Sequence, residues 1–490
     1  MFWQGIHENS PIRFGTDGWR GVIGAEFTFP RLIRGAQAAA QVLEATYGIP
    51  GQPRRIMVGF DLRFLAEEFA QAVAHTLEAQ GFDVFLAQGP APTPALSWAA
   101  TEYQALGSLV ITASHNPGIY SGLKVKGAFG GSVGAAVTQD IEALANGPLE
   151  QLERGTSRQT SGFCETFDPW RGYCKALKQK VDLGAIQGAI ASGQLQVYAD
   201  VMHGAAQSGL GRLLDCPIQE LNANRDPLFA GGAPEPIGRY LAKSQDILRT
   251  AGQGFAGQTI CLVFDGDGDR ISAIDGQGQL FTAQELIPIL IDHLVQEHNQ
   301  RGMVIKSLSA SSLIGKIAAL HHLPVIETPI GFKHIGDRMM VGDPVLLGGE
   351  ESGGIGYGNH IPERDALLSG LYLLEALVKS GHSLSEYYQM IQEKTKFTAH
   401  YGRVDLPLAS LEVKGRLERS LATEPPDAIL GTTVQDCQTF DGYKFYLGDR
   451  GWLLIRFSGT EPLLRIYCEA PTAELVDQTL TWGKNWAEAI

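Results

Sequence analysis

The sequence predicts an α/β protein of three or four domains that ends in a smaller α+β domain. Its 490 residues exceed what one hydrophobic core can serve, because domains average about 150 residues. Short apolar strands alternate with amphipathic helices through most of the chain, which is typical of mostly parallel sheets covered by helices. Beyond about residue 395 this alternation gives way to a hairpin, a last strand and a C-terminal helix.

The first β-α-β-α-β unit lies between residues 55 and 112. Proline at position 94 marks a helix start, since its missing N–H costs little in the first turn. We expect strands at 55–60, 82–87 and 109–112, and helices at 64–80 and from Thr93 onward.

The pattern then recurs, with three apolar strands that run into an aspartate, at Asp61, Asp200 and Asp265. This repetition hints at similar α/β units. We expect further strands at 195–199, 260–264, 303–306 and 344–347, helices at 285–298 and 311–321, a hairpin of 443–447 with 452–457, and a last helix at 473–488.

Composition excludes several classes of protein. With 44% hydrophobic residues the chain is not disordered, and 53 acidic against 39 basic residues give a net charge of -14. No basic stripe offsets this charge, so we expect neither nucleic acid nor a membrane as partner. Six scattered cysteines without a CxxC pair, no signal-peptide pattern and no apolar run of about 20 residues favour a cytoplasmic location.

Glycine is over-represented, at 59 of 490 residues against a usual ~7%. Many of these glycines form short clusters between expected elements. Such clusters permit tight turns and close approach of the backbone to a ligand, so functional residues are expected there.

The segment DGDGDR, 265–270, directly follows an apolar strand. Its alternating carboxylates leave the strand toward a common point and suit Mg²⁺ or Ca²⁺. An EF-hand loop is excluded, because Arg270 and Gly276 stand where that loop needs Gly and Glu. The alternative is a solvated acidic turn. The candidate metal ligands are Asp265, Asp267 and Asp269.

The segment TASHNP, 112–117, places Ser114 at the end of a buried strand, where a metal or base could activate it as a nucleophile or phosphoryl carrier. The G-x-S-x-G elbow of hydrolases is absent. His115 is too close in sequence to abstract the serine proton and is expected to bind or orient phosphate. A capped turn is the alternative.

The segment RFSGTEPLLR, 456–465, combines two guanidinium groups, two hydroxyls and exposed backbone N–H groups, as a phosphate site requires. A hairpin with surface arginines would explain the charges but not the compact SGT run. The candidate residues are Arg456, Ser458, Gly459, Thr460 and Arg465.

In GGEESGG, 348–354, Glu350 and Ser352 point the same way from an extended segment. A carboxylate beside a hydroxyl suits the vicinal hydroxyls of a sugar, although the motif alone is weak.

In this order the four motifs resemble the α-D-phosphohexomutase superfamily, which includes phosphoglucomutases and phosphomannomutases. FGTDGWRG at 14–21 and TPIGFKHIG at 328–336 are also similar to family segments, and the resemblance covers essentially the whole chain. It implies three similar α/β domains with mixed, mostly parallel sheets plus a smaller C-terminal α+β domain, around a central cleft. The expected boundaries are 1–160, 161–281, 282–394 and 395–490.

The resemblance also implies roles. Ser114 would be the phosphoserine and would hold Mg²⁺ with the three aspartates, while Glu350 and Ser352 would bind sugar hydroxyls. The five residues of 456–465 would hold the non-reacting phosphate of the substrate. The cleft would be lined by Thr16, Arg20, Lys124, Arg270 and Lys333.

The implied reaction interconverts glucose 1-phosphate and glucose 6-phosphate through glucose 1,6-bisphosphate, the intermediate and activator. The GEES loop favours glucose over mannose and glucosamine. The alternative is a glucose-1,6-bisphosphate synthase that releases the bisphosphate and uses a donor such as fructose 1,6-bisphosphate. A non-catalytic sensor would lack the serine or the aspartates, and a phosphatase would need a water-activating base that is not evident.

The sequence departs from the family at Arg364-Asp365, where many phosphoglucomutases have Lys-Asp. Arginine cannot be deprotonated in proteins and so cannot be the general base. Lys124, Lys333 and His334 are the remaining candidates. Sugar phosphates are the expected partners, bound by a monomer or a homodimer.

Overall fold

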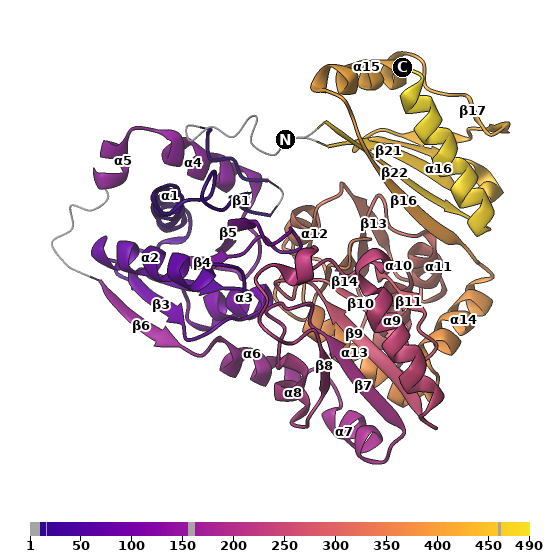
Figure 1. The fold of residues 1–490 in the computed structure, drawn as a ribbon, viewed down its shortest axis with the longest axis horizontal. Helices are drawn as coiled ribbons and strands as arrows, with labels where there is room; N and C mark the ends of the chain where they lie inside the picture. Colours follow the sequence, from indigo (N-terminus) through magenta and orange to yellow (C-terminus); the bar gives the residue numbers. More distant parts are fainter. Residues whose placement is uncertain (1–9, 16, 155–161, 459–461) are drawn as a thin grey trace.

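A computed structural model describes residues 10–15, 17–154, 162–458 and 462–490. In these residues it contains four large sheets in succession, each with its own helices, and a small two-stranded sheet (Figure 1). The N-terminal part lies on the left of the view, the second and third sheets lie at the lower right, and the C-terminal part lies at the upper right. The predicted fold class is confirmed.

The first sheet has the order β1-β5-β4-β2-β3-β6, in which β4, β2, β3 and β6 run parallel. Its strands are β1 (Trp19–Val22), β2 (Arg55–Phe60), β3 (Asp83–Ala87), β4 (Gly107–Ile111), β5 (Tyr120–Gly127) and β6 (Phe163–Phe167). The helices beside it are α1 (Phe29–Tyr47), α2 (Ala66–Ala79), α3 (Thr93–Glu102), α4 (Ala135–Asn146) and α5 (Leu149–Arg154). Since β6 pairs with β3, this sheet extends past the boundary expected at 160.

The second sheet has the order β11-β10-β9-β7-β8, with β9, β7 and β8 parallel. Its strands are β7 (Leu195–Asp200), β8 (Gln219–Leu221), β9 (Gln258–Phe264), β10 (Ile271–Asp275) and β11 (Leu280–Phe281). The accompanying helices are α6 (Pro169–Lys178), α7 (Leu183–Ala191), α8 (Gly209–Leu214) and α9 (Gly238–Gln253), with a 3₁₀ turn at Phe229–Gly231.

The third sheet has the order β13-β12-β14-β15, and its first three strands are parallel. Its strands are β12 (Met303–Ser307), β13 (Val325–Thr328), β14 (Val345–Gly349) and β15 (Ile355–Tyr357). The helices are α10 (Ala283–Gln296), α11 (Ser312–Leu320), α12 (Phe332–Met339), α13 (Ala366–Ser380) and α14 (Leu384–Thr395). Capping boxes at Thr282/Glu285 and Ser383/Glu386 start α10 and α14.

The fourth sheet is antiparallel throughout, in the order β16-β22-β21-β20-β19. Its strands are β16 (His400–Pro407), β19 (Asp436–Gln438), β20 (Tyr443–Tyr446), β21 (Trp452–Phe457) and β22 (Leu463–Ala470), with a separate ribbon of β17 (Ala428–Ile429) and β18 (Thr432–Thr433). Helices α15 (Leu411–Thr423) and α16 (Ala473–Glu488) complete it, and a 3₁₀ turn at Gly448–Arg450 closes the expected hairpin.

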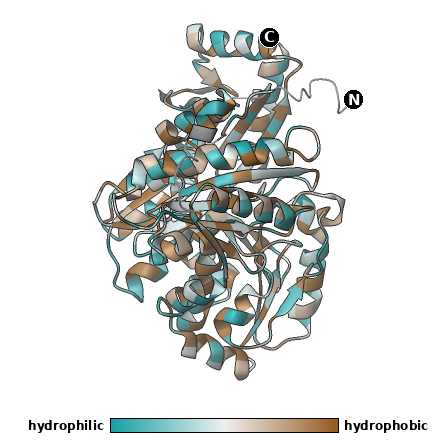
Figure 2. Ribbon diagram, turned by 90° about the vertical axis from the view of Figure 1, so that its left-hand side faces the viewer, coloured by the Kyte–Doolittle hydropathy of each residue, from teal (hydrophilic) through white to brown (hydrophobic). Residues whose placement is uncertain are grey.

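One continuous hydrophobic core runs through the first three sheets, whereas the fourth sheet has a core of its own. The outer helices alternate hydrophilic and hydrophobic residues, as amphipathic helices on a sheet do (Figure 2). Among the described residues, no helix has the length and apolar character needed to cross a bilayer.

The serine, metal and sugar motifs follow β4, β9 and β14 at their carboxyl ends. In sheets with parallel strands, ligands bind in the crevice at this edge. The fold therefore brings together loops that lie far apart in the sequence.

Candidate active site

Ser114 lies in the loop after β4, in a backbone conformation that non-glycine residues rarely adopt. Its φ is +52°, in the left-handed region, and its side chain is buried. The Ser114 N–H donates to Oγ1 of Thr112 (2.9 Å), whose hydroxyl donates to Asp61 (2.6 Å). These contacts hold the serine in the strained conformation, which is a feature of functional sites.

Arg63 holds the same loop from its other side. The guanidinium is fully buried, and its Nε donates to Oδ2 of Asp61 (3.1 Å). The remaining nitrogens donate to four backbone carbonyl oxygens, those of Ser114 (2.5 Å), Asn116 (2.7 Å), Pro117 (3.0 Å) and Tyr120 (3.0 Å). Such a fork of rigid donors fixes the path of the loop.

The metal motif lies directly against the serine. Oγ of Ser114 donates to Oδ2 of Asp265 (3.0 Å). This approach depends on Gly266, because a Cβ there would overlap the carbonyl oxygen of Ser114. All three aspartates are buried, and each offers a carboxylate oxygen within 4.8 Å of the others.

The aspartate cluster fits a divalent cation. Oδ1 of Asp267 and Oδ1 of Asp269 are buried and have no hydrogen-bond partner among the described residues. Burial, and then the neighbouring Asp269 and Asp267, raise the pKa of Asp265 well above its usual value. Unpartnered carboxylate oxygens crowded in this way provide the hard ligands that Mg²⁺ and Ca²⁺ prefer.

Lys124 lies behind the cluster. Its Nζ is 2.7 Å from carboxylate oxygens of Asp17, Asp267 and Asp269. Burial acts to lower the pKa of Lys124, but these three carboxylates outweigh burial and raise the pKa above its usual value. Lys124 therefore remains an ammonium in this arrangement.

Arg364 connects the metal motif with the sugar motif. Its Nη2 contacts Asp17 and lies 2.6 Å from Oδ2 of Asp269, and its Nη1 is 3.9 Å from Glu350. This residue departs from the family pattern in sequence, and here it acts as a fixed cation in an ion-pair network.

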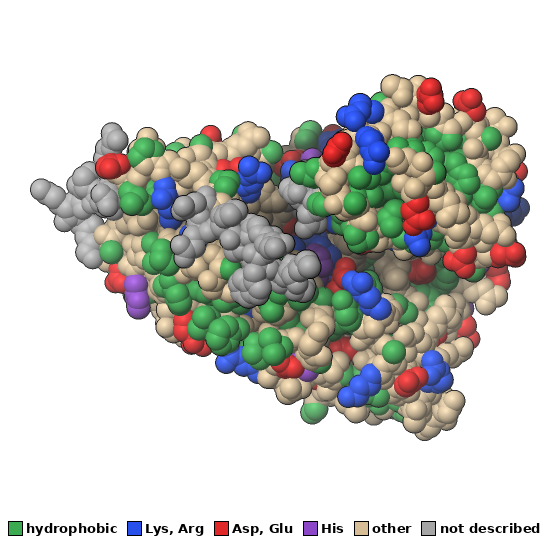
Figure 3. All heavy atoms as spheres, turned by 45° about the horizontal axis from the view of Figure 1, so that its top comes forward, with side chains coloured by type: hydrophobic (Ala, Val, Ile, Leu, Met, Phe, Trp, Pro, Cys, Tyr) green, Lys and Arg blue, Asp and Glu red, His purple; other side chains and the backbone are tan. Residues whose placement is uncertain are grey.

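A cavity of about 210 Å³ opens in front of these motifs. The space-filling view shows the molecule hollowed between its N-terminal and C-terminal parts, with Lys, Arg and His side chains exposed in the hollow (Figure 3). Eight of the predicted site residues line the cavity: Arg20, His115, Arg270, Lys333, Glu350, Ser352, Arg456 and Arg465. Arg364, noted in the sequence only as a departure from the family, also lines it, together with residues not predicted from the sequence, among them Asp17, Ser132, Glu235, Glu351, Arg403 and Tyr467.

His115 is surrounded by cations in this cavity. Its Nδ1 is 3.4 Å from Oγ of Ser114. Burial, followed by Arg270 and Arg20, lowers the pKa of His115 well below its usual value. The imidazole is therefore neutral at pH 7.

The sugar motif and the metal motif are joined by backbone contacts. The N–H of Ile271 donates to the carbonyl of Gly353 (3.0 Å), and Arg270 forms an antiparallel bridge with Gly354. Oε1 of Glu350 accepts from the N–H of Gly331 (2.9 Å). Burial, and then Glu351, raise the pKa of Glu350 to about 7.

The phosphate motif begins in β21 and ends in β22, where Arg456 lies directly opposite Arg465. Like charges opposite each other on adjacent strands destabilise a sheet. Arg456 is partly balanced by Asp441 (2.9 Å), which also accepts from the N–H of Ile330 (2.7 Å) in the third part of the chain. An anion bound between the two arginines would relieve their repulsion.

Some predicted residues lie elsewhere. Thr16, Gly459 and Thr460 lie outside the described residues. Lys124 is buried behind the cavity wall, and His334 is absent from the described lining although it adjoins Lys333 on α12. Ser458 is buried, and its N–H donates to the carbonyl of Leu463 (2.9 Å).

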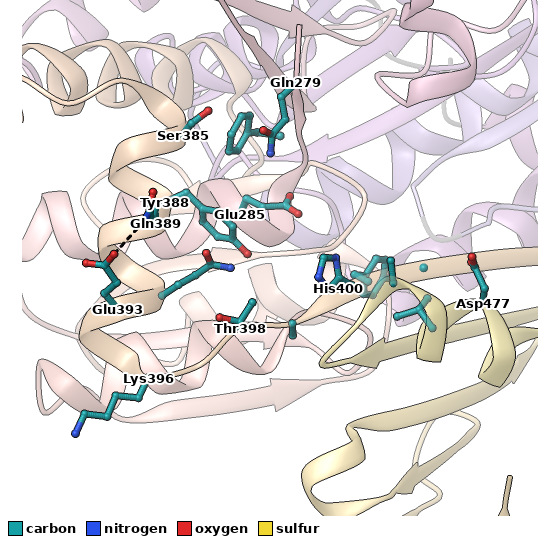
Figure 4. Close-up of a pocket in the computed structure, with 17 residues that line it drawn as sticks. Gln279, Glu285, Ser385, Tyr388, Gln389, Glu393, Lys396, Thr398, His400 and Asp477 are labelled. Atoms are coloured by element: carbon teal, nitrogen blue, oxygen red, sulfur yellow. Dashed lines mark hydrogen bonds between the residues drawn. The ribbon is translucent and has the colours of Figure 1, made fainter. Parts of the chain in front are cut away.

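A second, larger cavity of about 850 Å³ lies where the chain passes from α14 into β16 (Figure 4). Ser385, Tyr388, Gln389 and Glu393 of α14 line one side, and Asp477 of α16 lines the other. None of the predicted catalytic residues contributes to the described lining. Because the predicted cationic residues gather around the smaller cavity, that cavity is the better active-site candidate.

Each of the four parts of the chain matches a family model. Residues 11–151, 171–278 and 282–394 match phosphoglucomutase/phosphomannomutase alpha/beta/alpha domains I, II and III, and residues 412–480 match the C-terminal domain.

Similar proteins match over nearly the whole chain. A phosphoglucomutase/phosphomannomutase from Thermococcus kodakarensis is 29% identical, across 96% of this chain and 97% of its own. A phosphoglucosamine mutase from an Exiguobacterium species is 28% identical, across 95% of each. A crystal structure from Thermus thermophilus, provisionally described as a phosphomannomutase, has a TM-score of 0.82 and 34% identity over 98% of this chain and 99% of its own.

Proposed function

Because this chain belongs to the phosphoglucomutase/phosphomannomutase family and is a phosphohexomutase, we propose that it interconverts glucose 1-phosphate and glucose 6-phosphate through a phosphorylated Ser114. One observation carries the proposal. Oγ of Ser114 lies 3.0 Å from the aspartate cluster, and the next residue, His115, lines the cation-rich cavity. A phosphate on this oxygen would face both.

In the proposed reaction, the phosphoryl group leaves Oγ of Ser114 and bonds to a free hydroxyl of the hexose phosphate. The P–O bond at the serine breaks, and the proton of the sugar hydroxyl passes through the general base to Oγ of Ser114. The resulting bisphosphate turns end for end and returns its other phosphate to Ser114. Phosphoryl transfer depends mainly on positioning and charge neutralisation.

Asp265, Asp267 and Asp269 would hold Mg²⁺ next to the serine. When bound, the ion would neutralise charge on the transferring phosphoryl group. Lys124 keeps its proton among carboxylates, so we assign it charge neutralisation rather than proton acceptance. Between the other two candidates for the general base, Lys333 is better placed than His334 because it lines the cavity.

Glu350 and Ser352 would bind sugar hydroxyls, while Arg456 and Arg465 would hold the phosphate that does not react. The two arginines lie on a sheet with its own core, so they can hold either end of the sugar as it turns. The GEES sequence supports glucose as the substrate, with mannose phosphates as further substrates. The glucosamine relatives make glucosamine phosphate the comparison to test.

The test incubates the full chain with Mg²⁺ and glucose 6-phosphate, alone, with catalytic glucose 1,6-bisphosphate, or with fructose 1,6-bisphosphate. Parallel incubations contain glucosamine 6-phosphate in place of glucose 6-phosphate. Net formation of glucose 1-phosphate at a rate above that with glucosamine 6-phosphate supports the proposal. Accumulation of glucose 1,6-bisphosphate in step with consumed fructose 1,6-bisphosphate would instead identify a synthase. Ser114→Ala should abolish either activity, and turnover that survives this change would overturn the assignment of the phosphoserine.

A further inference from the structure

Three metal-ligating side chains meet at a second place, outside the active-site cavity. His293 lies near the end of α10, His298 follows that helix, and Glu375 lies within α13. Nε2 of His293 and Nε2 of His298 are 2.8 Å and 2.6 Å from the same oxygen, Oε2 of Glu375. The three ligand atoms all lie within 4.8 Å of one another.

The surroundings of Glu375 prepare it as a ligand. Its other oxygen, Oε1, accepts from the backbone N–H of Asp182 (2.6 Å), which fixes the carboxylate plane. Its Oε2 accepts hydrogen bonds from both histidines. One oxygen of the carboxylate is therefore held by the backbone, and the other is directed at the two imidazoles.

A simple ion pair would need one histidine. Here two imidazole rings, with centroids 5.3 Å apart and nearly perpendicular planes, converge on one carboxylate oxygen. Two imidazole nitrogens and one carboxylate oxygen, all within 4.8 Å of one another, form the His₂Glu set found in zinc sites with three protein ligands.

We propose that His293, His298 and Glu375 bind one Zn²⁺ ion. Imidazole ligands favour zinc and its transition-metal neighbours, whereas Mg²⁺ prefers oxygen ligands alone. The proposed site is thus chemically distinct from the aspartate cluster beside Ser114.

The rearrangement needed to accept the ion is small. Zinc bonds of 2.0–2.1 Å in a tetrahedron place neighbouring ligand atoms roughly 3.3 Å apart, so the histidines would move outward by about half an ångström. Each imidazole, which donates from Nε2 to Glu375 in the metal-free form, would lose that proton and carry one on Nδ1 instead, leaving the Nε2 lone pair for the ion. His293 and Glu375 are almost fully enclosed, but the His298 side chain is 21% exposed and leaves a route for the ion and a water as fourth ligand.

The consequence of zinc binding would be structural. Glu375 and His293 join α13 to α10 of the third part, and Asp182 immediately precedes α7 of the second part. A bound ion would therefore tie together two parts of the chain. Because none of these residues lines the active-site cavity, zinc should raise thermal stability more than it changes turnover.

The test titrates Zn²⁺ into chelator-treated full-length protein in excess Mg²⁺, against a chromophoric zinc chelator. The wild type should bind one equivalent of Zn²⁺ tightly, and its Tm should rise. His298→Ala should weaken zinc binding by at least about tenfold and abolish the gain, since even residues that only support metal ligands contribute that much. His298 is partly exposed and follows the helix, so this variant should fold.

Two control variants test whether the zinc instead binds at another histidine–carboxylate pair or at the aspartate cluster. His321→Ala removes another histidine that pairs with a carboxylate, Asp292 at 2.8 Å, and should keep the zinc equivalent. Asp267→Asn alters the aspartate cluster and should also keep it. Absence of tight binding, equal binding by His298→Ala, or loss only in Asp267→Asn would each overturn the proposal. Anomalous scattering at the zinc edge should give a peak between the two histidines and Glu375.

Discussion

Nη2 of Arg63 donates to the backbone carbonyl oxygen of Ser114 across 2.5 Å. A fully buried guanidinium thus holds the residue to which we assign phosphoryl transfer, although Arg63 itself does not line the cavity. Arg63 is a positioning residue, and its effect should appear in turnover more than in substrate binding.

Replacing Arg63 by lysine should lower kcat about 100-fold, because lysine cannot reproduce the fork and a displacement of about 1 Å at a reacting group costs that much. KM should change little. Arg249→Lys is the control, since that side chain is 49% exposed and its partner Asp246 is outside the described cavity lining. Steady-state kinetics measures kcat and KM of both variants, and circular dichroism checks that they fold. An unchanged kcat in folded Arg63→Lys would show that the hydrogen bonds from Arg63 to the serine loop are unimportant for turnover.

Gly266→Ala should uncouple the serine from the aspartates. The added methyl group would overlap the carbonyl oxygen of Ser114, so the two loops must separate. Activity should fall at least tenfold while the helices and sheets are retained. The matched control is Gly315→Ala in α11, where an added Cβ would have no neighbour within 4 Å. This substitution should stabilise the helix by up to about 1 kcal/mol. Equal activity in both variants would contradict the close approach.

Local signals made much of this molecule predictable from the sequence. Strand β2 occupies 55–60 as expected, because the short apolar run of residues 56–60 is typical of a buried strand. The hairpin of β20 and β21 follows from the glycines that flank Asp449 and Arg450. Strand β6 lacks such a signal, since four of its five residues, Phe163 to Thr166, are not buried.

Long-range contacts were not predictable in the same way. Asp17 and Lys124 form an ion pair although more than 100 residues separate them in the sequence. No local sequence pattern at either position predicts this pairing. Arg403 reaches the cavity from β16, a strand with half-exposed residues and no motif. Arg63 follows Asp61 in an unremarkable helix-start segment, so its role depends on where the serine loop folds.

Arg465→Ala should separate binding from stability. Removing one of two facing arginines relieves repulsion, so Tm should stay unchanged or rise slightly. KM for glucose 6-phosphate should rise about 10–100-fold, because a charge-assisted hydrogen bond contributes about 1.5–3 kcal/mol. Arg450→Ala, in the hairpin turn, is the control. An unchanged KM would show that the substrate phosphate binds elsewhere.

Removing divalent cations should abolish turnover, and Mg²⁺ should restore it. Asp267→Asn should lower kcat at least about 100-fold, since a metal ion supplies several kcal/mol of charge stabilisation to the transition state. Asp246→Asn, at an exposed carboxylate, should be neutral. Activity is measured after chelation and again after titration with Mg²⁺; turnover that persists in metal-free protein would exclude the proposed role of the aspartates.

Glu375 should make the stability of metal-free protein depend on acid pH. Its pKa is depressed from 4.5 to about 2, because the histidine hydrogen bonds outweigh burial. The folded state therefore gains stability from the ionised carboxylate above about pH 4.5 and loses it as the pH falls toward 2. The gain is on the order of 3 kcal/mol. The test is urea unfolding of wild type and Glu375→Gln in the presence of chelator. The free energy of unfolding of wild type should exceed that of Glu375→Gln at pH 6, and the difference should shrink between pH 4.5 and pH 3. A difference between the two proteins that does not change across that interval would mean that Glu375 is not the titrating group.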